Sequence, residues 1–145
     1  MLKFIHPAAG VLGLLIVISF WIATVWSEFA VSTATVVAVK TAIPWGFLIL
    51  VPALMVTGGS GFALTRGRGG RLIAIKRQRM PMIALNGLLV LVPAALFLAA
   101  KARAGEFDTL FYGVQLVELA AGAVNITLLG LNLRDGLRLR GRLRR

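Results

Sequence analysis

Cysteine is absent from this chain, and histidine occurs only once. Without cysteine there is no disulfide, no thiolate nucleophile and no iron–sulfur cluster, and a single histidine makes a structural zinc site untenable. The serines lack a hydrolase motif around them, and no second histidine exists to act as their base. We therefore expect a protein that is not an enzyme and that holds no metal.

Charge is also scarce, and acidic charge most of all. Of the 145 residues 14% are charged and 59% are hydrophobic, with a mean hydropathy of +0.90. An ordinary soluble domain has about a quarter of its residues charged, so this composition predicts an integral membrane protein. The net charge of +11 would suggest nucleic acid in a soluble chain. Here the cations lie between and after apolar segments, as in positive-inside loops, and we expect no nucleic-acid partner.

Four apolar stretches are long enough to cross a bilayer, since about 20 helical residues cover a hydrocarbon core of roughly 30 Å. The predicted spans are 7–27, 41–65, 80–100 and 108–133, with a basic loop at 66–79 and a polybasic tail at 134–145. The predicted fold class is therefore all-α, a four-span transmembrane helical bundle in one integral membrane domain. Pro52 and Pro93 predict kinks in the second and third spans.

The distribution of basic residues predicts the orientation of the bundle. Lys3, the loop and the tail place 13 cations on one side of the membrane, against Lys40, Lys101 and Arg103 on the other. The positive-inside rule then puts both termini in the cytoplasm, in a bacterial-type inner membrane. Basic residues on that side are expected to contact anionic lipid headgroups. They are Arg66, Arg68, Arg71, Lys76, Arg77, Arg79, Arg138, Arg140, Arg142, Arg144 and Arg145.

The fourth span carries a polar stripe, which we define as Gln115, Glu118, Asn125 and Asn132. Their spacings of three and seven residues put them on one helix face. A carboxylate at mid-depth costs several kcal/mol unless it is protonated or paired. Lys40 and Lys101 are expected near the outer rim, too far to neutralise Glu118, so we predict a protonated Glu118 that donates a hydrogen bond.

Two further polar contacts are predicted around the stripe. Gln115 lies one turn from Glu118 and could hydrogen-bond it. Asn86 of the third span matches Asn125 in depth, and these two amides are expected to bond across the helices.

A polar stripe inside a membrane fits two functions, helix packing or a proton or ligand site. We favour packing, in a small non-enzymatic accessory or self-associating subunit of a homo-oligomer or larger membrane complex. The alternative is a proton-coupled small carrier or proton relay using Glu118.

A haem- or quinone-linked electron-transfer subunit is the third possibility. His6 with Met80 or Met82, at the same membrane face, could hold a haem iron. No second histidine exists for a bis-histidine pair, and we expect no cofactor.

Overall fold

The computed structural model describes residues 2–29, 32–65 and 70–142, and every regular element within them is a helix. The helices are α1 (Leu2–Phe29), α2 (Thr33–Thr65), α3 (Arg71–Asn86), the π-helical turn η1 (Gly87–Leu91), α4 (Val92–Ala104) and α5 (Thr109–Arg142). The third span comprises α3, η1 and α4 in sequence. Four long apolar helices are thus each able to span a membrane, and the prediction of an all-α four-span bundle is confirmed.

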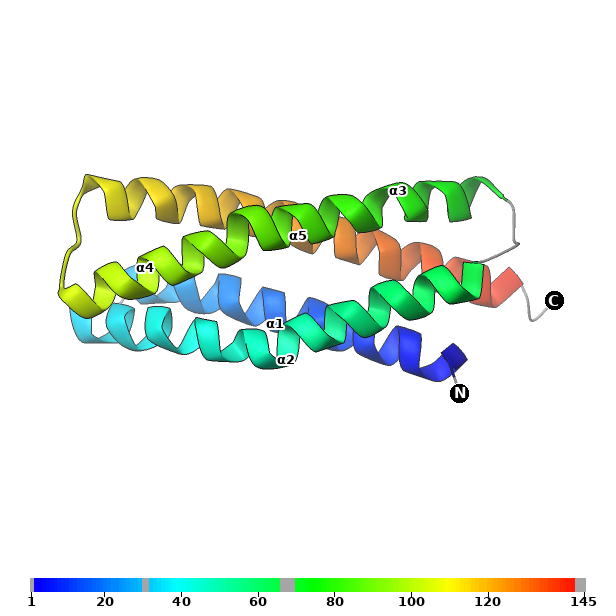
Figure 1. Cartoon of the computed structure of the whole chain (residues 1–145), viewed down its shortest axis with the longest axis horizontal. Helices are drawn as coiled ribbons and strands as arrows, with labels where there is room; N and C mark the ends of the chain where they lie inside the picture. The colour runs from blue at the N-terminus through cyan, green and yellow to red at the C-terminus, as the bar shows by residue number, and fades with distance from the viewer. Residues whose placement is uncertain (1, 30–31, 66–69, 143–145) are drawn as a thin grey trace.

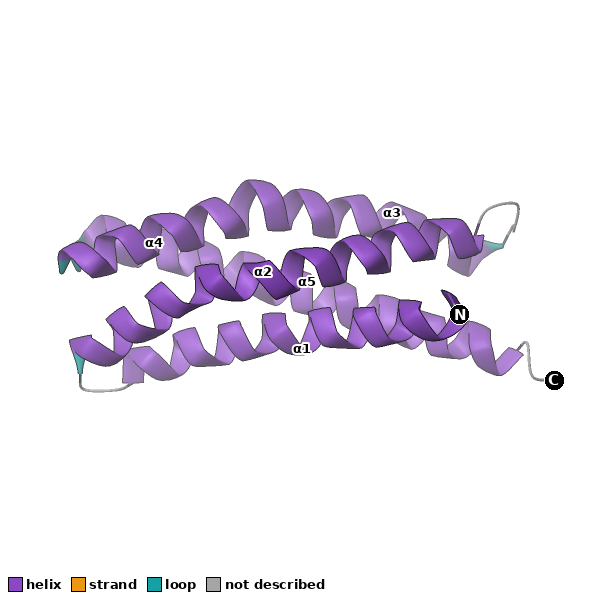
Figure 2. Ribbon diagram, turned by 60° about the horizontal axis from the view of Figure 1, so that its bottom comes forward, coloured by secondary structure: helices purple, strands orange, loops and turns teal. Residues whose placement is uncertain are grey.

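The four spans run alternately in opposite directions around a ring (Figure 1). Both termini lie at one end of the bundle, which we call the terminal end, and the turn from α4 to α5 lies at the other. The helix α1 packs along α2, α2 packs on α4, and α5 closes the ring between α1 and the third span. Figure 2 shows the same spans from a second side. The helices α2 and α3 scarcely touch, so the ring is loosest between them.

Apolar side chains form one core cluster in each half of the bundle. The first contains Val17, Leu50, Ile83 and Leu129, and the second contains Val36, Leu98, Ala102 and Phe111. Many large apolar side chains instead lie on the outside, Trp45 and Leu116 among them. In a bilayer such side chains face lipid tails, which are as apolar as they are, so their exposure carries no hydrophobic penalty.

The helices are longer than the predicted spans, because they continue through charged residues that were expected to end them. The helix α2 starts at Thr33, so Lys40 lies inside it. The helix α3 takes in part of the predicted loop, and α5 runs through most of the predicted tail. A charged side chain does not interrupt backbone hydrogen bonding, and it remains in a helix wherever it reaches a partner or the interface.

Pro93, where a kink was predicted, follows an interruption of α-helical hydrogen bonding. The third span passes through the π-helical turn just before this proline. Because proline lacks an N–H and its ring crowds the carbonyl one turn earlier, here that of Leu89, a wider turn relieves the clash. In α2 the helix continues unbroken through both Pro44 and Pro52.

Candidate functional site: an ion pair beside a cavity

A cavity of about 310 Å³ lies between the four spans, and each of them contributes to its wall. The wall is mostly aliphatic, with three aromatic side chains, Phe20, Trp21 and Phe47. Its polar residues are Thr24, Glu118 and Asn125. A mostly apolar cavity with a few polar groups is the usual form of a small-molecule site.

Two glycines make room for the aromatic side chains of α1. Gly46 of α2 lies directly beneath the Phe20 ring, leaving no space for a Cβ. A Cβ on Gly122 of α5 would come within 3.0 Å of Trp21 Cδ1. The Trp21 indole N–H donates to the Leu119 carbonyl at 2.9 Å. These contacts fix α1 against both α2 and α5 and hold the aromatic wall in place.

The cavity reaches the outer surface of the bundle. Met55 of α2 and Leu88 of η1 both line it, although they are 70% and 59% exposed. They lie where α2 and the α3–η1 part of the third span are only loosely packed. The opening therefore faces sideways, toward the lipid.

Glu118 is paired with a lysine. Lys40 Nζ donates to Glu118 Oε2 at 2.5 Å, and the two side chains are 1% and 11% exposed. The prediction that no cation reaches Glu118 is wrong. The expectation of a protonated Glu118 that donates a hydrogen bond depended on it and loses its basis. The error arose because the second span was taken to begin at 41, with Lys40 before it at the outer rim, whereas Lys40 lies seven residues inside α2. The predicted partner Gln115 is buried with its Oε1 lacking a hydrogen bond among the described residues.

The middle of the stripe behaves as predicted. Asn86 Nδ2 donates to Asn125 Oδ1 and to the Ala121 carbonyl, both at 2.9 Å. Asn125 Nδ2 lies 3.4 Å from the Ile83 carbonyl. The bond between the two asparagines across the helices is confirmed.

All four stripe residues are buried within this chain's own bundle. The prediction that the stripe packs against a partner is therefore wrong, because its polar contacts are made with α2 and α3 of the same chain. A buried face offers no surface to a second chain.

A second polar group of residues lies toward the terminal end. Asp135 of α5 is 2% exposed and accepts a hydrogen bond from Arg79 of α3 at 2.8 Å. Its Oδ1 has no hydrogen bond among the described residues, although Arg134 Nε lies 3.5 Å away. Lys76 Nζ lies 3.4 Å from His6 Nε2. Arg79 and Lys76 thus contact groups of the bundle, and their contact with headgroups stays a prediction.

The other predicted headgroup contacts also stay predictions. Arg138 is exposed near the end of α5, as the prediction requires. Arg66, Arg68, Arg144 and Arg145 lie outside the described residues, as do the side chains of Arg71, Arg77, Arg140 and Arg142.

The residues suggested as haem ligands do not form a ligand pair. His6 Nδ1 lies 3.1 Å from the Thr57 carbonyl, which requires an N–H there, and 3.0 Å from Ser60 Oγ. Met80 Sδ accepts a hydrogen bond from Asn132 at 3.3 Å, and Met82 is 57% exposed. Each side chain is engaged elsewhere or points outward. Within the described ranges no three His, Cys, Asp or Glu side chains gather as a metal site.

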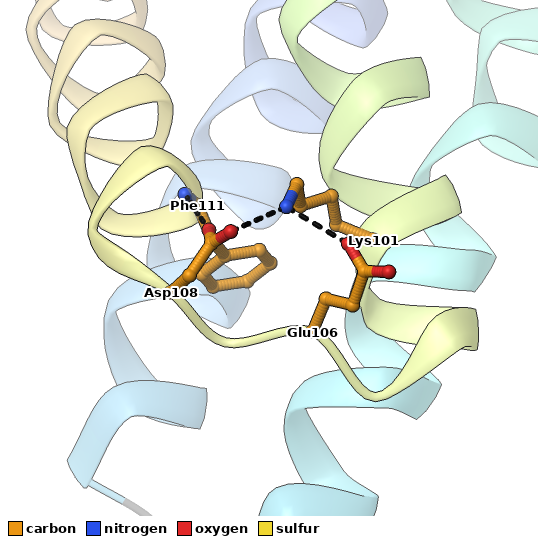
Figure 3. Close-up of polar contacts among 4 residues, drawn as sticks. All are labelled: Lys101, Glu106, Asp108 and Phe111. Carbon is orange, nitrogen blue, oxygen red and sulfur yellow. Dashed lines mark hydrogen bonds and ion pairs between the residues drawn. The ribbon is translucent and has the colours of Figure 1, made fainter.

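The end opposite the termini is held by an exposed ion-pair network (Figure 3). Lys101 Nζ donates to Glu106 at 2.9 Å and to Asp108 at 2.6 Å. Asp108 Oδ1 also accepts the Phe111 backbone N–H at 2.9 Å and so caps α5. The hydrogen bonds from Lys101 and Phe111 hold the pKa of the Asp108 carboxyl below its ordinary value. Gly105 has a φ of 70°, a left-handed conformation that ends α4 and starts this turn.

The fold and the site together define a multi-pass membrane protein, built as a four-helix bundle around a cavity with a buried ion pair. No protein-family model, curated protein or solved structure matches this chain. Its function is therefore inferred from the geometry of the site.

Proposed function

We propose that this protein is a small non-enzymatic membrane carrier that binds a lipophilic molecule in the cavity, coupled to a proton at Glu118. One observation carries the proposal: a cavity open toward the lipid has a carboxylate on its wall, paired with a buried lysine. Ionisable groups inside a membrane are costly and commonly mark transport paths or proton relays. Structural packing alone would require neither the cavity nor the opening.

The ion pair supplies the coupling. A proton on Glu118 removes the charge that stabilises Lys40, and an uncompensated buried ammonium is strongly unfavourable. Lys40 lies on α2, the helix that also carries Met55 at the side opening. Protonation of Glu118 therefore weakens the contact between α5 and α2, the helix that borders the opening. A ligand that favours one state of the pair shifts the population toward that state.

The test is transport in proteoliposomes loaded with a panel of lipophilic fluorescent dyes, under an imposed pH gradient. We expect gradient-driven dye movement that Glu118→Gln abolishes, because an amide cannot release a proton. Since that variant leaves Lys40 unpaired, Lys40→Met/Glu118→Gln is assayed beside it and is also expected to be inactive. Glu106→Gln, at a carboxylate whose side chain is 59% exposed, serves as the matched control. Dye movement equal to that of protein-free liposomes would overturn the proposal.

We further propose the predicted orientation, with both termini in the cytoplasm of a bacterial-type inner membrane. The shared position of the termini and the basic residues at their end support it. The chain has no native cysteine, so cysteines introduced singly at Ser32, Gly70 or Gly105 label unambiguously. An impermeant thiol reagent is expected to label the Ser32 and Gly105 positions from outside intact cells. Labelling at Gly70 from outside would reverse the orientation.

An accessory or self-associating subunit is the second candidate. It is favoured by the short connections between the described helices, which leave the lateral surface as the main area for contact. With the stripe buried, such contact would use outward side chains such as Trp45 and Leu116. Mass determination after purification in mild detergent tests it: a second copy or a bound partner supports this role, and a lone monomer contradicts it.

A further inference from the structure

We infer that the cavity selects uncharged lipophilic molecules with a hydroxyl group at one end, most of all a phenol-type hydroxyl on an aromatic ring. This inference rests on the proposed function, because it names the class of molecule that the cavity binds. Three features of the site point to this class: the hydrogen bond that the wall still offers, the charge of the site, and the shape of the wall.

The cavity wall offers a hydrogen-bond acceptor, so the ligand must supply the donor. The Asn125 amide is already bonded on both sides, to Asn86 and to the Ile83 carbonyl, and the Trp21 N–H is bonded to Leu119. Lys40 is the one hydrogen-bond partner of Glu118 among the described residues, and it takes Oε2. The carboxylate keeps 11% of its surface accessible and lines the cavity. An ionised carboxylate only accepts, so the ligand must donate. Thr24 adds a hydroxyl that can do either.

The charge of the site requires an uncharged ligand. Lys40 already balances Glu118, so a cationic ligand would place a second positive charge beside a buried ammonium. An anion would meet the carboxylate on the wall, while Lys40 is 1% exposed and does not line the cavity. Both charged ligands would also lose their hydration in a mostly apolar space. A neutral hydroxyl donor avoids both the charge repulsion and the loss of an ion's hydration.

The shape of the wall favours an aromatic ring on the ligand. Phe20, Trp21 and Phe47 lie around the cavity, and aromatic rings favour edge-to-face or offset contact with one another. The rings of Phe20 and Phe47 already make such an edge contact, with centroids 6.1 Å apart. An aromatic ring on the ligand extends this arrangement. Any alkyl tail can leave through the opening at Met55 and Leu88 into the lipid.

Trp21 supplies a native reporter on the cavity wall. The other two tryptophans, Trp26 and Trp45, are 71% and 70% exposed, and replacing both by phenylalanine leaves Trp21 as the only indole. The probes are 4-bromophenol, 4-bromoanisole and 4-bromobenzylammonium, each carrying a bromine that quenches indole fluorescence. The first two differ only by a methyl group on oxygen, which removes the donor. Concentrations are expressed as probe dissolved in the membrane, so that partitioning does not enter the comparison.

We expect saturable quenching of Trp21, with the phenol binding about tenfold more tightly than the anisole, as one hydrogen bond to a charged acceptor implies. The ammonium is expected to bind least. In Lys40→Met/Glu118→Leu, which removes the acceptor without leaving a lone charge, the preference for phenol should disappear while anisole binding remains. Glu106→Gln is the matched control and should keep the full preference.

Equal binding of phenol and anisole to the unaltered pair, or tighter binding of the ammonium, would overturn the inference. This comparison needs no change at Glu118, so it holds even if the double variant fails to fold. A preference that persists in the folded double variant would also overturn it. Transport is measured separately. Phenol-selective quenching without gradient-driven transport would refute the carrier alone, and saturable quenching without selectivity would refute the ligand class alone.

Discussion

Two buried ion pairs join α5 to other helices, one to α2 across the bundle and one to the adjacent α3, and their surroundings differ. Glu118 and Asp135 are seventeen residues apart on α5, about 26 Å along the helix axis. Lys40 and Glu118 are buried beside a mostly apolar cavity, with side chains 1% and 11% exposed. The side chains of Arg79 and its partner Asp135 are 20% and 3% exposed, and Lys76 lies nearby.

The difference shows that a buried charge depends most on its ion-pair partner where no other contact can stabilise it. Arg79 lies toward a membrane surface, where a long basic side chain can extend its charge to water or headgroups. Asp135 has Lys76 as a second cation whose charge acts on it. Lys40 and Glu118 have only each other among the described residues. Loss of one partner should therefore be far more damaging at the Lys40 pair.

The largest effect is expected from Lys40→Met, which leaves Glu118 buried without a cation. We expect a loss of about 3–5 kcal/mol in the free energy of unfolding, the usual cost of an uncompensated buried charge. Lys40→Met/Glu118→Leu should recover most of it, because both charges are gone. Unfolding in mixed micelles with increasing denaturing detergent measures both. If the single and double variants are equally unstable, the two residues are not coupled.

A smaller loss is expected from Arg79→Met, at about 1–2 kcal/mol for a buried acceptor that loses its donor. Lys76 should partly compensate, since its charge already acts on Asp135. Adding Lys76→Met should then cost more in the Arg79→Met background than in the unaltered protein. Strict additivity of the two substitutions in the same unfolding assay would rule out this compensation.

Asn86→Ala, midway between the two pairs, separates the effect of losing a hydrogen bond from the effect of leaving a charge unpaired. It removes the donor to Asn125 Oδ1 and to the Ala121 carbonyl without leaving a charge. Hydrogen bonds between membrane helices contribute about 0.6–1.7 kcal/mol, and the loss in the same unfolding assay should lie in that range. A loss for Asn86→Ala as large as that for Lys40→Met would mean that charge is not what distinguishes the buried pair.

The smallest effect is expected at the exposed Asp108 network, where water competes with every contact. Because the folded pKa of Asp108 lies below the 3.8 of a free carboxyl, its contribution to stability is present above pH 3.8. It is lost as the pH falls from there through the lowered pKa. Melting temperatures measured across that range should show a decline that Asp108→Asn reduces.

The sequence predicted the number and class of the helices well, because length and apolar content decide whether a segment can cross a bilayer. It also predicted the bond between Asn86 and Asn125. Both residues could be placed by counting along helices from the same membrane face, and amides at equal depth readily meet.

The Lys40–Glu118 pair was missed because a charge was treated as the end of a span. Counted from Thr33, Lys40 lies about 10 Å along α2, and counted from Thr109, Glu118 lies about 13 Å along α5. This match in depth, together with a carboxylate that lacks a partner, was the signal available in the sequence. The sequence carries no comparable signal for the cavity, because the cavity depends on how far α2 and α3 diverge and on which way Phe20 and Trp21 point.

The π-helical turn at Gly87–Leu91 also sets the angular phase of everything that follows it in the third span. Each residue advances an α-helix by about 100°, and a π turn accommodates one residue more than an α turn. Deleting a single outward residue here, such as Leu89 at 69% exposure, would therefore restore a regular α-helix and leave α4 in its present phase. Deleting Leu96 from the regular helix that follows would instead rotate the rest of α4 by about 100° and turn Leu98 and Ala102, now 0% and 1% exposed, away from the core. The π-helical turn is thus a place where this span can lose a residue without turning its buried face toward the lipid.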